Sequence, residues 1–261
     1  MKLISWNVNG IRAAEKKGFI SYAIQSGADI ICLQETKAHP EQLSDKLRNL
    51  PGYQAWFHAA NRKGYSGTAL YSRYSPRTVT YGLGLSDFDT EGRTLIADYG
   101  TFVLYNIYFP NGTASSERLK YKLDFYEAFH RHVLKTREEG LPVVVCGDVN
   151  TAHLPVDLAR PAENTNVSGF LPEERAFIDR FLASGFDDTF RLFNQEGSQY
   201  TWWDMKTRAR DRNVGWRIDY FFTSQDLRPL VKNAWIESEK EGSDHCPVGL
   251  DLAIHPEEEQ S

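Results

Sequence analysis

Short apolar segments bounded by turn residues recur along the chain, and they predict a protein built mainly from β-strands. Two of these segments, VVVC at 143–146 and the IICL part of ADIICL at 28–33, are continuously apolar, which is typical of strands covered on both faces. Strands are predicted at residues 3–8, 30–34, 53–58, 68–72, 95–97, 102–108, 143–146, 200–203, 218–223, 233–238 and 248–253.

Three segments have the pattern of helices. Residues 41–50 follow a proline and stop at a Pro-Gly pair, and residues 172–184 begin at a proline and stop before a glycine. The longest segment, 116–137, carries one apolar stripe at helical spacing. Strands that predominate, with helices between them, predict an α+β fold: a four-layered α/β sandwich of two packed, mostly antiparallel sheets flanked by helices.

Neither a linker nor a short repeat divides the chain. We therefore expect one domain over residues 1–254, followed by an acidic tail at 255–261. The Gly/Pro/Asn-rich stretch 154–169 is long for a connection, and long loops in compact domains tend to be functional.

The composition narrows the class of protein. With 41% hydrophobic and 13% aromatic residues, the chain can bury a full core. Its net charge of -5 counts mildly against a nucleic-acid binder, although a local basic stripe matters more than the total. Cys32, Cys146 and Cys246 form no CxxC pair, so we expect buried, reduced thiols. Without an apolar run of ~18 residues or a signal peptide, we expect no membrane span and a cytoplasmic location.

Polar clusters follow the predicted strands. Five of them are SWNVNG at 5–10, LQE at 33–35, YFPN at 108–111, GDVNTAH at 147–153 and GSDHCP at 242–247. A sixth, WRIDYFF at 216–222, places Asp219 inside an apolar strand, where a charge must be paired or bound. Each alone could be a turn residue or, for Asp219, a structural ion pair. Together, carboxylates and amides without thiolates indicate a site for a hard metal ion such as magnesium or calcium.

These motifs resemble the exonuclease III family of apurinic/apyrimidinic endonucleases, within the endonuclease/exonuclease/phosphatase superfamily. The resemblance extends from residue 1 to about 254, with all six clusters in the family order. It implies a catalytic domain of the superfamily type, with Mg²⁺ as cofactor and Mn²⁺ as its substitute. It also implies a monomeric DNA repair enzyme, active at the nucleoid, whose partner is double-stranded DNA with abasic or damaged nucleotides.

The resemblance implies hydrolysis of the phosphodiester 5′ to abasic sites, with 3′-to-5′ exonuclease and 3′-end processing activity. Incision at uracil or other damaged nucleotides is left open. Glu35 is implied as the principal magnesium ligand, helped by Asn7 and Asp244. One departure is Asn9, at a position that is acidic in some family members. The wider implied metal site adds Asp148, Asn150 and His245.

Catalytic roles follow from the same resemblance. Asp148 would activate the attacking water, and Asn150 would orient that water or the phosphate. His245, oriented by Asp219, would bind the scissile phosphate and stabilise its charge. Two further residues would contact the phosphate from the other side: Tyr108 and Asn111.

The strongest DNA-binding signal is TWWDMKTRARDRNVGWR at 201–217, which interleaves cations with tryptophans. The resemblance places Trp202 and Trp216 on the walls of a pocket for an extrahelical abasic sugar, whereas Trp203 is expected in the core. Lys206 is a candidate for wedging into the duplex. The other predicted DNA contacts are Arg62, Lys63, Tyr65, Lys120, Lys122, Asn164 and Arg208.

Two alternatives remain at this point. One is another enzyme of the superfamily, such as a lipid or inositol phosphatase or an RNA deadenylase, although the basic tryptophan-rich segment favours DNA. The other is a non-catalytic DNA-binding module on the same scaffold. An inactive relative should have lost part of the predicted machinery, which is all present here: Glu35, Asp148, Asn150, Asp219 and His245.

Overall fold

The computed structural model describes residues 1–254, and in that range the strands form two six-stranded sheets and one short hairpin. The first sheet contains β1 (Lys2–Asn7), β2 (Ile30–Gln34), β3 (Gln54–His58), β4 (Thr68–Ser72), β13 (Val231–Ile236) and β14 (Val248–Leu252). The second contains β5 (Thr78–Tyr81), β6 (Thr94–Asp98), β7 (Val103–Tyr108), β8 (Val143–Asp148), β9 (Phe186–Asp188) and β12 (Asp219–Ser224). The hairpin pairs β10 (Trp202–Trp203) with β11 (Gly215–Trp216).

The two sheets share one plan. Their strand orders are β13-β14-β1-β2-β4-β3 and β5-β6-β7-β8-β12-β9. Each has a single parallel pair near its centre, β1 with β2 and β7 with β8, and its other pairs are antiparallel. The carboxyl ends of two parallel strands lie at the same edge of a sheet, so both sheets bring their central strand ends to one edge.

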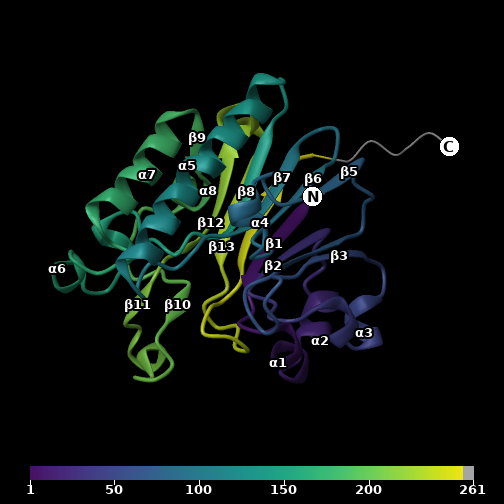
Figure 1. Ribbon diagram of the computed structural model, residues 1–261, viewed down its shortest axis with the longest axis horizontal. Helices are drawn as coiled ribbons and strands as arrows, with labels where there is room; N and C mark the ends of the chain where they lie inside the picture. Colours follow the sequence, from purple (N-terminus) through teal and green to yellow (C-terminus); the bar gives the residue numbers. More distant parts are fainter. Residues whose placement is uncertain (255–261) are drawn as a thin grey trace.

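Helices cover the outer faces of both sheets (Figure 1). The α-helices of the described residues are α1 (Ile11–Lys16), α2 (Phe19–Gln25), α3 (Asp45–Arg48), α4 (Ser86–Asp89), α5 (Ser116–Glu138), α6 (Pro161–Asn164), α7 (Pro172–Ala183) and α8 (Thr189–Phe193). Apolar residues of α1–α3 pack on the first sheet, and those of α5 and α7 pack on the second. The predicted four-layered α+β sandwich with mostly antiparallel sheets is thus confirmed.

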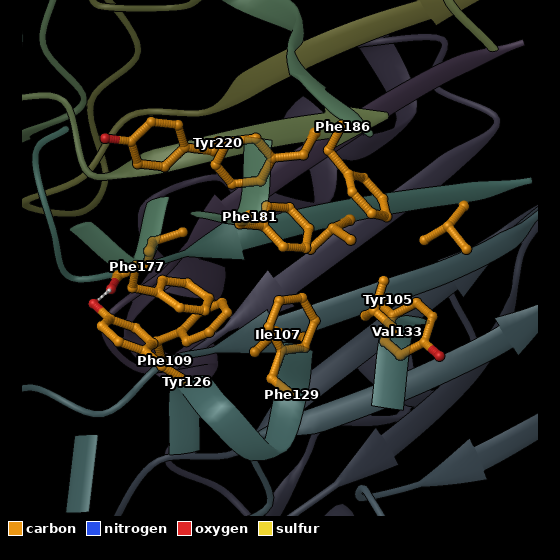
Figure 2. Packing of buried hydrophobic residues seen from close by; sticks show 14 of the residues in the cluster. Tyr105, Ile107, Phe109, Tyr126, Phe129, Val133, Phe177, Phe181, Phe186 and Tyr220 are labelled. Carbon is orange, nitrogen blue, oxygen red and sulfur yellow. Dashed lines mark hydrogen bonds between the residues drawn. The ribbon is translucent and has the colours of Figure 1, made fainter. Parts of the chain in front are cut away.

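The apolar cores follow from side-chain alternation in the strands. In β8, Val144 and Cys146 point into the core between the sheets, while Val143 and Val145 face the helices. Figure 2 shows the outer core, where aromatic rings of α5 and α7 cover the second sheet. Tyr126 there stacks on a ring of α7 with centroids 4.0 Å apart. Strands with both faces buried explain the continuously apolar segments of the sequence.

Some predicted boundaries differ from the structure. The helix expected at 41–50 is instead a 3-10 turn, Pro40–Gln42, followed by α3, because Leu43 is extended and Ser44 starts a new helix by accepting from the Leu47 amide. The predicted strand 200–203 shortens to β10. The predicted tail at 255–261 lies outside the described residues. Among residues 1–254, no helix has the length and apolar character needed to cross a bilayer.

Candidate active site

A layer of polar side chains lies between the two sheets at the edge where the central strands end. Alternation places Asn7 at the end of β1 and Asp148 at the end of β8 on the inner faces, beyond the apolar residues that precede them. Deeper in the seam, Gln34 Nε2 donates to Ser5 Oγ at 2.9 Å and to Asn106 Oδ1 at 2.8 Å. The two sheets are therefore joined by hydrogen bonds directly beneath the candidate site.

Asn7 connects two carboxylates that come from different sheets. Its Nδ2 donates to Glu35 Oε2 at 3.0 Å and to Asp148 Oδ2 at 2.8 Å, and the residue is fully buried. Glu35 follows β2 directly and has a left-handed φ of 57°, which turns its side chain toward Asn7. The other Glu35 oxygen, Oε1, lies 2.8 Å from Lys37 Nζ. Glu35 is thus already paired with a cation in this structure.

The turn after β8 fixes Asp148 and Asn150 relative to each other. The Asn150 amide N–H donates to Asp148 Oδ1 at 2.8 Å, and Asn150 has a φ of 54°. Asn150 Nδ2 donates to the Phe109 carbonyl at 2.8 Å, and its Oδ1 accepts from Asn111 Nδ2 at 3.1 Å. YFPN and GDVNTAH, far apart in the sequence, are therefore neighbours here.

A buried imidazole–carboxylate pair lies on the other side of Asp148. His245 Nδ1 is 2.8 Å from Asp219 Oδ2, which also accepts from the Thr201 hydroxyl at 2.6 Å. His245 Nε2 is 3.8 Å from Asp148 Oδ2. Burial lowers the pKa of His245, but the charges of Asp219, Asp148 and Asp244 outweigh burial and raise that pKa to about 10. His245 is therefore an imidazolium at neutral pH.

The environment of Asp148 raises the pKa of this carboxyl group above that of an exposed aspartate. Burial raises the pKa of Asp148 to about 7, against the lowering effect of the neighbouring His245 charge. A carboxylate with a pKa near neutrality can accept a proton far more readily than one with a pKa near 4. Asp148 consequently has the properties of a general base.

Asp244 precedes His245 and is half-buried. Asn9 Nδ2 donates to its Oδ1 at 2.8 Å, and Trp202 Nε1 donates to its Oδ2 at 3.1 Å. Burial raises the pKa of Asp244, but His245 and these two donors outweigh it and lower that pKa. Asp244 therefore stays ionised and adds a third carboxylate beside Glu35 and Asp148.

These groups surround a cavity of about 390 Å³. Its polar side is formed by Glu35, Asp148, Asn150, His245, Tyr108 and Asn111. Its apolar wall is formed by Trp202, Trp216, Ile218 and Val167. The rings of Trp202 and Trp216 meet edge to face, with centroids 6.5 Å apart. A charged, hydrogen-bonding floor and an aromatic wall suit a ligand with one anionic and one apolar part.

The oxygen donors fit a hard metal ion in chemical type. Glu35, Asp148 and Asp244 offer carboxylates at one cavity, and within residues 1–254 the Asp219 Oδ1 atom is buried without a hydrogen-bond partner. Asp148, Asp219 and His245 also offer ligand atoms that lie within 4.8 Å of one another. The positive charge that His245 retains disfavours direct ligation by its ring. The Glu35 side of the cavity is the better cation site.

The chain is similar to known proteins over nearly its whole length. Residues 4–245 match the Endonuclease/Exonuclease/phosphatase family. The exodeoxyribonuclease of Bacillus subtilis is 42% identical over 97% of this chain and 100% of its own length. The DNA-(apurinic or apyrimidinic site) endonuclease of Dictyostelium discoideum is 38% identical over 96% of this chain and 70% of its own.

This chain belongs to the exonuclease III-type AP endonucleases of the endonuclease/exonuclease/phosphatase family. A solved structure with the same fold is the 3′ phosphatase from Neisseria bound to a product DNA hairpin. It superposes with a TM-score of 0.90 at 26% identity, covering 97% of this chain and 99% of that one. The family resemblance expected from the sequence motifs is thereby confirmed.

The expected DNA-contacting residues lie on two sides of the cavity. Lys206 and Arg208 are exposed on the loop between β10 and β11, which projects beyond the sheets in Figure 1. Arg62 and Lys63 are exposed in the turn before β4, on the side of Tyr108. Asn164 ends α6 and donates to a carbonyl of its own turn at 2.7 Å.

Two expectations need qualification. The structure contradicts a DNA contact for Lys122, because that side chain is 0% exposed and forms an ion pair with Glu174. Tyr65 is half-buried, and its hydroxyl accepts hydrogen bonds from Arg93 and Arg118, which both also form ion pairs with Glu91. An apolar stripe assigns only part of a helix surface, and Lys122, three residues after Leu119, contacts the turn after β8 and the first turn of α7.

Sequence reasoning missed several residues that hold the site in place. Asn106 is a polar position inside the otherwise apolar β7, a signal that could have identified it, and Gln34, in the LQE cluster at the end of β2, was given no role. Thr201 has no such signal, since only the fold brings its hydroxyl to Asp219. Arg217, grouped with the DNA-facing cations, is instead buried against Asp188 and a second carboxylate.

Proposed function

We propose that this chain is a DNA repair nuclease that hydrolyses the phosphodiester 5′ to an abasic site. The same centre would remove 3′-terminal nucleotides and 3′-blocking groups. The observation that carries the proposal is the cavity itself, where Asp148 and the His245–Asp219 pair face an aromatic wall of Trp202 and Trp216. The names of the relatives, an exodeoxyribonuclease and an apurinic-site endonuclease, support DNA over other phosphoesters as the substrate.

We propose Mg²⁺ as the cofactor, with Mn²⁺ able to replace it. Glu35 would be its principal ligand, with Asn7 holding that carboxylate and Asp244 in support. Asp148, Asn150 and His245 would surround the ion and the phosphate. When bound, the ion supplies positive charge that stabilises the phosphate and leaving oxygens. Lys37 Nζ lies 2.8 Å from Glu35 Oε1, so this carboxylate already has a positive charge beside it.

Each polar residue of the cavity has a separate proposed role in the reaction. Asp148, with its pKa near 7, accepts the proton of the attacking water, and Asn150 orients that water. The His245 imidazolium donates to a phosphate oxygen and stabilises the charge that develops there. Asp219 keeps His245 charged and oriented. Tyr108 and Asn111 would contact the phosphate from the opposite side.

The aromatic wall selects the substrate. An abasic nucleotide is less costly to rotate out of the duplex than an intact one, because no base pair or full stack is lost. Its sugar would pack against Trp202, Trp216 and Ile218 while its phosphate reaches the polar floor. Lys206 and Arg208 would hold the flanking duplex. We further propose that residues 1–254 form one catalytic domain and that the enzyme acts as a monomer.

The test uses an end-labelled duplex with one abasic-site analogue, incubated with Mg²⁺ or with EDTA. We expect one incision 5′ to the analogue with Mg²⁺ and none with EDTA. An inositol phosphate and a single-stranded RNA serve as competing substrates in parallel. Release of phosphate from the inositol phosphate, or shortening of the RNA, without incision of the duplex would overturn the proposal. Light scattering of the same sample tests the monomer.

A further inference from the structure

Lys122 and Glu174 form an ion pair that is wholly enclosed, at 0% exposure for both side chains. Lys122 belongs to α5 and Glu174 to the first turn of α7. Lys122 Nζ donates to Glu174 Oε1 at 2.6 Å, to the Asn150 carbonyl at 2.7 Å and to Thr151 Oγ1 at 2.9 Å. An ammonium has three N–H donors, so all three have partners. Two of those partners lie in the turn that follows Asp148.

Glu174 continues the connection to the cavity wall at Ser168 and Gly169. Its Oε1 accepts from the Ser168 hydroxyl at 2.8 Å, and its Oε2 accepts from the Gly169 amide at 2.5 Å and the Leu171 amide at 3.0 Å. Ser168 and Gly169 both line the candidate active site. One buried carboxylate therefore holds the backbone of the cavity wall while its partner holds the backbone of the catalytic turn.

Helix packing alone does not require this pair. Removing two charges from water costs free energy, and apolar residues of similar volume pack two helices at least as well. What apolar residues cannot supply is a donor for the Asn150 carbonyl and an acceptor for the Gly169 amide. Asn150 has a left-handed φ of 54°, a conformation unfavourable for a residue with a side chain and in need of support from its surroundings.

The two supported segments also touch each other. The Ala152 amide donates to the Gly169 carbonyl at 2.8 Å. Gly169 has a φ of 101°, and a Cβ there would lie 3.1 Å from the Trp216 ring. The Gly169 backbone therefore packs closely against Trp216, while the Asn150 amide N–H holds the Asp148 carboxylate. A shift of the Lys122–Glu174 pair would move the catalytic turn and the aromatic wall together.

We infer that Lys122 and Glu174 are positioning residues that fix the catalytic turn 148–151 against the cavity wall at Ser168 and Gly169. This inference rests on the proposed nuclease function. Lys122 acts through the Asn150 carbonyl, and Glu174 acts through the Gly169 amide. Neither touches the substrate, so their effect on the reaction is through geometry.

The experiment separates positioning from stability. Lys122→Met and Glu174→Gln each leave a buried charge or donor unpaired, and each should lower Tm and reduce kcat on the abasic duplex. The double variant Lys122→Met/Glu174→Leu replaces the pair with apolar side chains. We expect it to recover most of the Tm while kcat stays about tenfold or more below wild type, since displacement of reacting groups by about 1 Å can cost up to a hundredfold in rate. Recovery of kcat together with Tm would overturn the inference.

A matched control lies on the same two helices. Arg180 of α7 and Glu127 of α5 form a half-exposed ion pair 2.5 Å apart, remote from both loops. Arg180→Met and Glu127→Gln should leave kcat and KM unchanged. Equal losses in the control variants and in Glu174→Gln would also overturn the inference.

A second readout does not depend on nuclease activity. Hydrogen exchange of the Gly169 and Ala152 amides should be slow in wild type and in the Arg180→Met control, and at least tenfold faster in Glu174→Gln. Unchanged protection of Gly169 in Glu174→Gln would refute the proposed role of the carboxylate. If the wild-type protein cut no DNA, the proposed function would fail, whereas the exchange result would still decide whether the pair holds these segments.

Discussion

Asn7 Nδ2, on β1 of the first sheet, donates a 2.8 Å hydrogen bond to Asp148 Oδ2, on β8 of the second. The bond crosses the seam between the sheets, and both residues are almost completely buried. An amide from one sheet thus fixes the orientation of the proposed base on the other. The site depends on the packing of the two sheets as well as on the residues within each.

Asp148→Asn should lower kcat by about 10²–10⁴-fold on an abasic duplex, because an amide cannot accept a proton from water. The near-isosteric side chain should leave the fold and DNA affinity intact. Single-turnover cleavage measures the first effect, and fluorescence anisotropy of labelled duplex in EDTA measures the second. Cleavage at the wild-type rate would contradict the role of Asp148 as base.

Glu35→Gln should weaken binding of the divalent cation by about tenfold or more, since it removes the carboxylate charge while keeping the side-chain shape. Calorimetry with Mg²⁺, or electron paramagnetic resonance with Mn²⁺, measures this without any DNA. Glu41→Gln, an exposed position outside the cavity, provides the matched control. If both variants bound the cation as wild type does, Glu35 would not be the principal ligand.

The His245 ring should remain protonated well above neutral pH in metal-free protein. Its pKa is raised to about 10 by Asp219 and Asp148 despite burial, and its unfolded value is about 6.5. The paired imidazolium therefore stabilises the fold fully below about pH 6.5, and this stabilisation is lost as the pH rises through about 10. Nuclear magnetic resonance titration of the ring should give a midpoint near 10. A midpoint close to 6.5 would mean that the pair with Asp219 does not form in solution.

Lys206→Ala and Arg208→Ala should weaken DNA binding at low salt, and each should reduce the slope of log Kd against log salt concentration by about 1. Both side chains are exposed on the loop that joins β10 to β11. Lys135→Ala, at the far end of α5, removes an exposed charge away from the cavity and should leave the slope unchanged. Identical slopes in all three variants would place the DNA elsewhere on the surface.

Sequence reasoning was most reliable where one local signal decided the outcome. Apolar runs such as VVVC at 143–146 identified strands buried on both faces, and the apolar stripe of α5 identified the longest helix. It was least reliable where a local signal was weak. The helix predicted at 41–50 divides at Leu43. Lys122 was assigned to the DNA surface because no residue near it in the sequence indicates an ion pair with Glu174, 52 residues away.

By itself, the sequence determined the class of fold and the chemical types of the site, since strand periodicity and the GDVNTAH and GSDHCP motifs are local properties of the chain. Only the tertiary structure decided which groups meet. His245 and Asp219 are 26 residues apart and Asn7 and Asp148 are 141 apart, and their contacts depend on the parallel strand pairs that bring distant strand ends to one edge. The tertiary structure also decides the raised pKa values of Asp148 and His245, because burial and neighbouring charges arise only once the sheets have packed.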